Sequence, residues 1–532
     1  MTDTQPQTKD SLSDGEPSSK FAIPPITIDQ FNRIEADVLA FWPTASHLPE
    51  DRKTLSVFDH AEKLIKTNPV KRTDARRDEF RLFLSSKVEG LLGKEVATSV
   101  YRQLETNHSI ATAQHHSPLS PKTLNPTLAM ALAYANRQEQ DRQNLIILGC
   151  SGISFNNHWY PRGHLFHSLV NDEIIENQLN FFGRAFDANP VITSPAYKVD
   201  LKKTMEKTLL HFRSEKLIKK RELNRISQLL DEIYFTPHTL SQEYYVDQLT
   251  ITNFYMWKKI FENFEGTMPN LIFLSQEKIA AELLQKFHIK NETLLHQVLF
   301  NKDWHKLIYK YFDGIMCAFS VKRNYGTYLF WATPKNTTDR VQLFEKDGAL
   351  VSPNGKIKIE LTSESISKAL ENEDITPSTM LTFLVLSLYY GFALTGGLDQ
   401  PTYLEQTKEA YLAMLSELEL TEEVENVKQV VANDMILTRP TIAFLDGPHD
   451  QRTHASGLDL LVNGSRDSWQ TIIDASKTIT FQDILYRLYP ELYRDYCKHE
   501  KDPELMKITE RQIERYTGTD KKIPAWNTLT NL

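Results

Sequence analysis

The sequence predicts an α/β fold with a mostly parallel sheet, because short apolar runs alternate with long helical patterns. Residues 144–150 (NLIILGC) and 269–275 (PNLIFLS) are apolar throughout and bounded by polar turns, as buried parallel strands are. The second run leads directly into QEKIAAELLQKF, which has helical spacing. Strands that alternate with helices are typical of the α/β class. We therefore expect these two runs to be buried neighbours in one sheet.

Composition and periodicity divide the chain into successive segments. The first residues are rich in Ser, Asp, Gln and Pro, which cannot form a hydrophobic core. The later segments differ in whether helical or strand patterns prevail. The predicted organisation is a disordered tail (1–25), a helical N-terminal region (26–106), the first part of the α/β core (107–196), a helical insert (197–262), the remainder of the core (263–467) and a helical C-terminal region (468–532).

Within the second part of the core, residues 314–320 and 326–333 predict a strand pair around the turn VKRN. The dipeptides DG and NG that follow predict hairpins, and 436–445 is a candidate last strand. The longest apolar run, 380–394, is shorter than the ~20 residues that a membrane span needs. We interpret it as a buried core helix and expect no membrane association.

Charge and cysteine content restrict the class of protein. The formal net charge is -8 and no basic half or stripe occurs, so nucleic acid is not an expected partner. Cys150, Cys317 and Cys497 lie far apart without a CxxC pair, which argues against disulfides and cysteine-bound zinc. The polar N-terminus has no apolar signal segment. These features predict a cytoplasmic location and leave the oligomeric state open.

The polar loop AQHHSPLSPKT, residues 113–123, is the first candidate site. Its prolines exclude a helix, so His115 and His116 are expected on a structured loop close to a strand. Imidazoles in that position are candidates for acid–base catalysis near neutral pH. Lys122 and Thr123 precede a predicted helix, whose N-terminus can hold an anion. The alternative is that these side chains only cap turns.

A second polar loop, SGISFNNHWYPR, follows the strand NLIILGC. Small residues at its start allow close approach to a ligand, and an arginine can bind a carboxylate or phosphate through two hydrogen bonds. The alternative is a loop of Asx turns, and Cys150 before it is expected to be an inert thiol. The substrate-binding candidates are Ser151, Asn156, Asn157, His158 and Arg162.

The third candidate is TGGLDQPTYLEQTK, residues 395–408, which follows the apolar run. Its two glycines, Gly396 and Gly397, leave backbone N–H groups accessible, and Asp399 is a candidate catalytic group. The alternative is a glycine helix cap. His158, His164 and His167 lack an acidic partner at metal-binding spacing, so no metal site is predicted. Walker A, GxGxxG and GxSxG motifs are absent, which leaves the cofactor unknown.

Two stretches resemble the bacillithiol-biosynthesis cysteine-adding enzymes. ATAQHHSPLSPKTLNPTLAMALAYANRQ followed by NLIILGC is similar in layout to the front of that family, where a TGQQ-type loop precedes a helix and a strand. PSTMLTFLVLSLYYGFALTGGLDQPTYLEQTKEAYLAML, followed by ILTRPTIAFL, is similar to its later segment. The resemblance implies a Rossmann-like core and a cytosolic small-molecule site. By position it assigns Gln114, Gly396, Gly397 and Tyr403 to that site.

Two functions are compatible with these patterns. The first is a cytosolic enzyme of small-molecule metabolism or biosynthesis, of a ligase or transferase kind, that joins or modifies a polar anionic metabolite. In that case the three loops converge, and His116, Arg162 and Asp399 are expected to line one pocket. The second is a non-catalytic interaction or effector protein on an enzyme-like scaffold. Its working surfaces would then be the N-terminal tail and the 197–262 insert.

Overall fold

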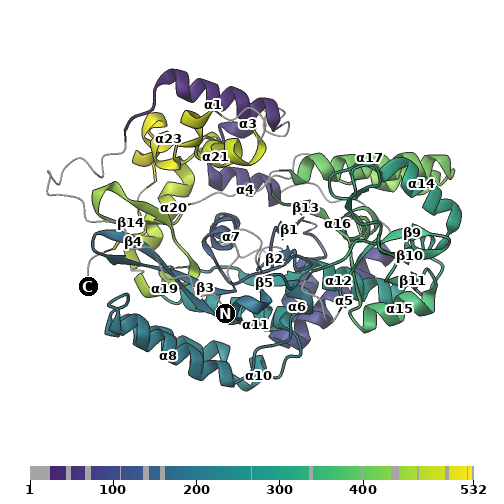
Figure 1. Ribbon diagram of the computed structural model, residues 1–532, viewed down its shortest axis with the longest axis horizontal. Helices are drawn as coiled ribbons and strands as arrows, with labels where there is room; N and C mark the ends of the chain where they lie inside the picture. Colours follow the sequence, from purple (N-terminus) through teal and green to yellow (C-terminus); the bar gives the residue numbers. More distant parts are fainter. Residues whose placement is uncertain are drawn as a thin grey trace.

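A four-stranded parallel sheet lies at the centre of the molecule, with strand order β13-β1-β2-β5 (Figure 1). The four strands are β1 (Ser109–Ala113), β2 (Asn144–Gly149), β5 (Asn270–Ser275) and β13 (Ala393–Thr395). The computed structural model describes residues 24–42, 50–65, 74–107, 109–135, 143–155, 162–264, 266–334, 339–397, 399–432, 442–463, 466–497, 502–523 and 525–529.

The strands β2 and β5 pair over their whole length, from Asn144 opposite Asn270 to Gly149 opposite Ser275. The prediction of two parallel neighbours is therefore confirmed. Every residue of β2 is buried, because the two faces of the sheet meet different hydrophobic cores. Leu145 and Ile147 enter one core, whereas Ile146 and Leu148 enter the other. Burial on both faces explains why the run is apolar without alternation.

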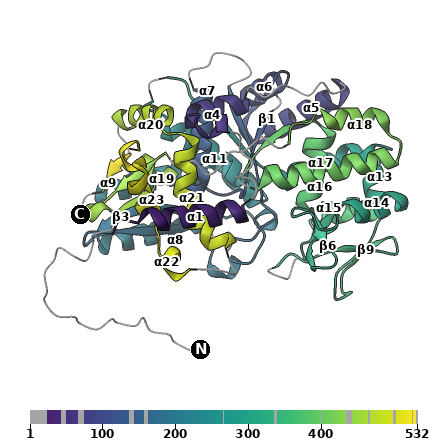
Figure 2. The same ribbon diagram turned by 90° about the horizontal axis from the view of Figure 1, so that it is seen from above.

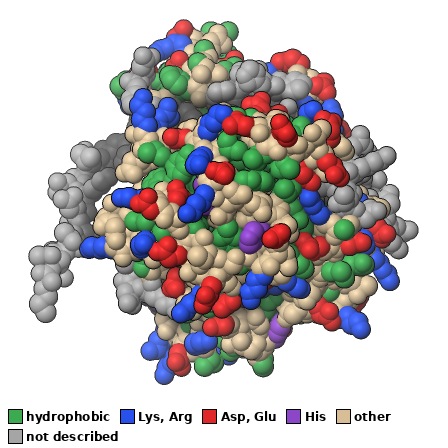
Figure 3. Space-filling view, turned by 90° about the vertical axis from the view of Figure 1, so that its right-hand side faces the viewer, with side chains coloured by type: hydrophobic (Ala, Val, Ile, Leu, Met, Phe, Trp, Pro, Cys, Tyr) green, Lys and Arg blue, Asp and Glu red, His purple; other side chains and the backbone are tan. Residues whose placement is uncertain are grey.

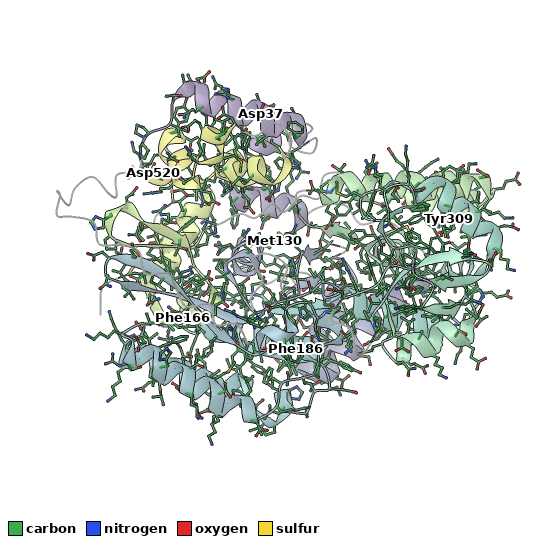
Figure 4. All side chains as sticks on the ribbon, in the orientation of Figure 1. Asp37, Met130, Phe166, Phe186, Tyr309 and Asp520 are labelled. Atoms are coloured by element: carbon green, nitrogen blue, oxygen red, sulfur yellow. The ribbon has the colours of Figure 1, made fainter. Side chains whose placement is uncertain are left out.

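Helices cover both faces and form two lobes on opposite sides of the sheet (Figures 1 and 2). The first core contains α7, whose Met130 lies near the middle of the molecule in Figure 4. The first core is built from α1 (Ile28–Phe41), α4 (Val57–Ile65), α7 (Pro121–Tyr134), α19 (Gly457–Asn463), α20 (Arg466–Thr478), α21 (Phe481–Tyr496), α22 (Pro503–Met506) and α23 (Glu510–Thr517), with the short α3 (Glu50–Lys53) beside α21. The second core is built from α5 (Asp74–Leu92), α6 (Lys94–Gln103), α12 (Gln276–Leu283), α13 (Leu294–Phe300), α14 (Lys302–Phe312), α15 (Ser363–Glu371), α16 (Thr379–Phe383), α17 (Gln400–Glu417) and α18 (Thr421–Lys428).

Residues 197–262 are largely helical, as predicted. They form α8 (Asp200–Ser214), α9 (Lys220–Leu229), a π-helical turn (Leu230–Tyr234), α10 (Pro237–Leu240) and α11 (Tyr245–Ile260). The last of these, α11, packs directly against β5 and contributes side chains to both cores. This helix therefore belongs to the covering layer of the sheet.

An antiparallel hairpin of β3 (Gly163–Val170) and β4 (Glu173–Asn180) lies beside this core. Asn171 and Asp172 at its tip both have positive φ, as a two-residue hairpin turn requires. The hairpin is not expected from the sequence pattern, because β3 carries histidines among its apolar residues. Asp459 anchors it: its carboxylate accepts hydrogen bonds from the His167 backbone N–H at 2.7 Å and from the Ser456 backbone N–H at 2.9 Å.

Strand pairing differs from the expectation around residues 314–333. The predicted pair is reduced to β6 (Phe319–Ser320) with β7 (Tyr325–Gly326), and β8 (Phe330–Ala332) instead pairs with β12 (Ile375–Pro377). The hairpins predicted from DG and NG are present, since β9 (Phe344–Lys346), β10 (Ala349–Val351) and β11 (Lys358–Glu360) form one antiparallel sheet. Figure 3 shows the face of this lobe, where charges of both signs are interspersed.

The prediction of one helix over 380–394 is wrong at its end. The helix α16 continues into a π-helical turn (Leu384–Tyr389), and Gly391 with φ +80 redirects the chain into β13.

The predicted last strand, β14 (Phe444–Asp446), pairs with β15 (Arg452–His454) and β16 (Asn527–Thr528). Residues 436–441 of the predicted strand lie outside the described residues. Pro490 lies within an unbroken α21. In the described part of the chain, no helix is both long and apolar enough to cross a membrane.

The hairpin anchor gives a test of this architecture. Replacing Asp459, which is fully buried, by alanine leaves the N–H groups of His167 and Ser456 without their acceptor. We expect Asp459→Ala to lower the free energy of unfolding by about 3 kcal/mol or more. The control is Asp474→Ala on α20, where an exposed carboxylate accepts one bond from Gln470 and the loss should stay below about 0.5 kcal/mol. Equal urea midpoints for the two variants would contradict the anchoring role.

Candidate functional site

The direction in which successive strands are added to the sheet reverses at β1, between β2 on one side and β13 on the other. From β1 the chain proceeds to β2 and then to β5 on one side, and it returns to the other side of β1 as β13. In open parallel sheets, ligands bind outside the carboxyl ends of the strands at such a reversal point. We call this place the switch point.

A cavity of about 50 Å³ lies at the switch point. The end of β1, the first two turns of α7 and the loop after β13 form its walls. Four of the residues singled out from the sequence lie there, namely Gln114, Lys122, Thr123 and Gly397. The complete lining is Ala111, Thr112, Ala113, Gln114, Lys122, Thr123, Pro126, Thr127, Ile147 and Gly397.

A side-chain bridge holds β1 and β13 together beside this cavity. The hydroxyl of Thr112 lies 2.9 Å from the carbonyl oxygen of Thr395 and 2.7 Å from Oε1 of Gln400, and it can donate to either. Gln400 in turn donates to the carbonyl oxygen of Leu394 at 3.0 Å. A side chain at Gly396 would collide with Gln400 and Thr112, so the bridge explains why this position is glycine.

Lys122 provides the positive charge of the cavity. Its ammonium group donates to the carboxylate of Glu491, on α21, at 2.9 Å, and both side chains are only 11% exposed. Near this pair lies Glu510, a half-buried acidic residue on α23. Burial disfavours the charged form of Glu510, but His454, Arg487 and Lys122 together lower its pKa to about 2. The C-terminal helices thus contribute directly to the electrostatics around Lys122.

His116 is enclosed in the protein and does not line the cavity. Its Nε2 lies 3.1 Å from the carbonyl oxygen of Phe273, which can only accept, so Nε2 carries the proton. Burial lowers the pKa of His116 to about 4, which leaves the ring neutral at physiological pH. Its Nδ1 has no hydrogen-bond partner among the described residues. His115 is also buried, with 6% of its surface exposed.

A second polar cluster lies at the carboxyl ends of β2 and β5. The buried carboxylate of Glu277 accepts hydrogen bonds from Cys150 Sγ at 2.9 Å and from the Ser151 backbone N–H at 2.8 Å. The Ser151 hydroxyl is within hydrogen-bond reach of both Glu277 and Ser275. Burial and the nearby Glu277 raise the pKa of Cys150 well above its usual range, as suits an inert thiol.

The glycines around this cluster contact the protein itself. A side chain at Gly149 would lie 2.8 Å from the Cα atom of His116, and one at Gly152 would lie 3.1 Å from Glu277. Arg340 donates to the carbonyl oxygen of Gly152 at 2.8 Å. Glu277 and Arg340 had not been singled out from the sequence, because an acidic residue in the first turn of a helix and an isolated arginine carry no distinctive signal.

The remaining candidates are dispersed. Arg162 pairs with Asp187 at 2.8 Å and donates to the carbonyl oxygen of Phe182 at 3.2 Å, at the base of the hairpin. Tyr403 stacks on Phe383, with 5.7 Å between ring centroids. Asp399 precedes α17, and neither it nor Arg162 or His116 lines the cavity. Asn156, Asn157 and His158 lie outside the described residues.

Neither metal-ligand geometry nor comparison with known proteins assigns a further role to these residues. Within the described ranges, no group of three or more His, Cys, Asp or Glu side chains is arranged to hold a metal ion. Comparison of the sequence with protein-family models and with curated proteins finds no match.

The adjacent glycines after β13 form a matched pair of tests. Gly396→Ala should break the bridge of Thr112 and Gln400 and lower stability by about 1–3 kcal/mol, as overpacking does. Gly397→Ala should change stability by less than about 0.5 kcal/mol, because the added carbon would lie 3.7 Å from Gln114 Nε2 in ordinary contact. Thermal unfolding of both variants measures the difference. If Gly397→Ala were the more damaging change, the described loop geometry would be wrong.

The buried imidazole predicts a pH dependence. The pKa of His116 in the folded chain, about 4, is below the ordinary value of 6.5, so its contribution to stability is complete above pH 6.5. That contribution is lost as the pH falls from 6.5 to 4 and amounts to something on the order of 3 kcal/mol. Urea unfolding at several pH values should show a smaller loss for His116→Gln than for the unmodified chain. Parallel curves would contradict the neutral, buried state.

Proposed function

We propose that the chain is an enzyme of small-molecule metabolism that binds a polar, anionic metabolite at the switch point of a Rossmann-like core. The observation that carries this proposal is the cavity between β1 and β13, where Lys122 and Thr123 stand at the start of α7. The positive end of the helix dipole and a lysine both favour negative charge. The cavity fits one carboxylate or phosphate group, and the remainder of the metabolite would extend toward solvent.

Lys122 is the anion-binding group in this proposal, because the neutral His116 cannot contribute charge. The lysine is already paired with Glu491, so a ligand anion would share or take over that contact. Gln114 and the Thr123 hydroxyl would orient the ligand through hydrogen bonds. The resemblance to the cysteine-adding enzymes supports the same region, since Gln114 and Gly397 line the cavity and Gly396 lies beside it.

The alternative is a non-catalytic effector protein on the same scaffold. One observation favours it: the polar groups at the carboxyl edge are largely satisfied within the protein, with Lys122 held by Glu491 and Glu277 held by Ser151 and Cys150. On this alternative the cavity is a packing defect. Ligand binding distinguishes the two functions, because only the first needs Lys122 to exchange its partner.

The test uses Lys122 and its partner together. Lys122→Gln should weaken binding of citrate or inorganic phosphate roughly tenfold or more, the worth of a charge-assisted hydrogen bond. It should also destabilise the fold, because Glu491 then stays buried without its cation. The double variant Lys122→Gln/Glu491→Gln should recover stability but not binding. Calorimetric titration and thermal unfolding measure the two effects.

Each outcome of that experiment decides between the functions. Loss of binding in both variants, with recovered stability in the double variant, supports the proposal. If the unmodified chain binds neither anion, or if Lys122→Gln binds as tightly as the unmodified chain, the lysine has a structural role and the effector alternative stands.

A further inference from the structure

A large groove lies at the opposite edge of the sheet, where β2 and β5 begin. Its volume is about 920 Å³, within the range of roughly 300–1,000 Å³ that is usual for small-molecule pockets. The groove is surrounded by α6 along its length, the end of α7, α11 and the segment before β5. The lining residues are Lys94, Glu95, Val96, Thr98, Ser99, Arg102, Tyr134, Gln143, Lys258, Thr267, Met268, Pro269 and Asn270.

The charges of this groove are unbalanced. Among the residues that the structure describes, Lys94 and Arg102 on α6 and Lys258 on α11 line it together with one acidic residue, Glu95. Within the described residues, none of the three cations forms an ion pair, and Lys258 only lies over the ring of Phe254 at 4.4 Å. A concave surface lined by one sign of charge concentrates the field and attracts ions of the opposite sign.

The cations of the preceding helix show that this arrangement is local. On α5, Arg76 pairs with Glu423 at 2.7 Å, Arg81 with Asp78 at 2.9 Å and Lys87 with Glu282 at 2.7 Å. Neighbouring cations on the same lobe are thus neutralised by carboxylates, whereas the groove cations have no such pair with a described carboxylate.

The floor of the groove is held rigidly by amide and hydroxyl hydrogen bonds. Gln103 and Asn144 exchange two bonds of 2.7 Å, and Asn144 also donates to the Ser99 hydroxyl at 2.7 Å. The Ser99 hydroxyl donates to the side-chain oxygen of Gln143 at 2.9 Å. The backbone carbonyl oxygen of Gln143 accepts a hydrogen bond from the backbone N–H of Asn270. These bonds fix α6 against the starts of both strands, so the cations stand on a preorganised base.

We propose that this groove binds a small-molecule polyanion, with at least two phosphate or carboxylate groups, held by Lys94 and Arg102 from one side and Lys258 from the other. Apolar surface from Met268, Pro269 and Tyr134 would contact the uncharged part of the ligand. The strand β2 separates the groove from the switch point by roughly 20 Å at ~3.3 Å per residue. Ligands at the two sites cannot react with each other at that distance, so the polyanion is an effector and not a second substrate.

The test is calorimetric titration of the full chain with inorganic pyrophosphate and, separately, with citrate, at ~0.1 M salt, where exposed charges beyond about 10 Å are screened. We expect Lys94→Gln/Arg102→Gln to weaken binding of at least one probe roughly tenfold or more. Both side chains are exposed on α6, so the variant should unfold at an unchanged temperature. The matched control is Lys203→Gln/Lys207→Gln, which removes the same charge from the exposed face of α8 and should leave binding unchanged.

A third variant, Lys122→Gln/Glu491→Gln, separates this groove from the switch point. Binding that depends on Lys94 and Arg102 but not on Lys122 supports the groove. Binding that depends on Lys122 alone overturns the groove proposal while it supports the proposed function. Absence of binding by either probe, or equal weakening in the α8 control, also overturns the groove proposal. Slower hydrogen exchange of the α6 amides on addition of the bound probe provides an independent location of the site.

Discussion

The parallel pairing of β1 with β13 is the contact on which the whole carboxyl edge depends. It joins positions 283 residues apart in the chain, as between Thr112 and Thr395. The paired register is short, from Ser109 opposite Ala393 to Ala111 opposite Thr395, so the backbone alone offers few hydrogen bonds. The bridge of Thr112 and Gln400 adds side-chain bonds to this junction, and the glycine at 396 leaves the space that the bridge requires. Without this junction the reversal of strand order, and the cavity beside it, would not form.

The same edge shows how the chain stabilises buried polar groups. Glu277 is 3% exposed, and donors from the loop after β2 compensate its desolvation. Lys122 and Glu491 compensate each other in the same way across the boundary between α7 and α21. Removal of one partner of such a pair costs free energy, because the other partner is then left unpaired in a low-dielectric place. The C-terminal helices are therefore energetically coupled to the start of α7.

Local pattern explains which parts of the fold could be predicted. The strands 144–149 and 270–275 are predictable because burial on both faces makes them wholly apolar. The strand β13 is not, because its three residues continue an apolar helix and only the positive φ of Gly391 separates the two. The hairpin of β3 and β4 is hidden for a different reason. Its buried histidine, His167, depends on Asp459, which lies 292 positions away and cannot be paired with it by any local rule.

In the candidate site, too, the residues with local signals were predictable and the partners that depend on long-range packing were not. Lys122 and Thr123 follow from the prolines and the helix start, which are local signals, and both line the cavity. Arg162 has an equally suggestive position, but Asp187 neutralises it, and this pairing depends on how the hairpin folds back. Glu491 is beyond local prediction as well, because its role arises only where α21 packs near α7. Sequence patterns thus identify groups that are able to bind an anion, whereas long-range packing decides which of them line a cavity and which carboxylate each of them pairs with.

That distinction separates the two edges of the sheet. At the carboxyl edge the cationic Lys122 is 11% exposed and compensated, so an incoming anion must compete with a protein carboxylate. At the opposite edge Lys94, Arg102 and Lys258 are exposed and form no ion pair with any described carboxylate, so an anion there does not displace one of those carboxylates. The chain as a whole carries a net charge of -8 and repels anions at long range. Because salt screens that repulsion over about 8 Å at physiological ionic strength, the local cations govern the field inside the groove. Affinity for an anion at the carboxyl edge should thus depend mainly on the geometry of its contact with Lys122. Affinity at the opposite edge should depend mainly on the number of cations in the groove.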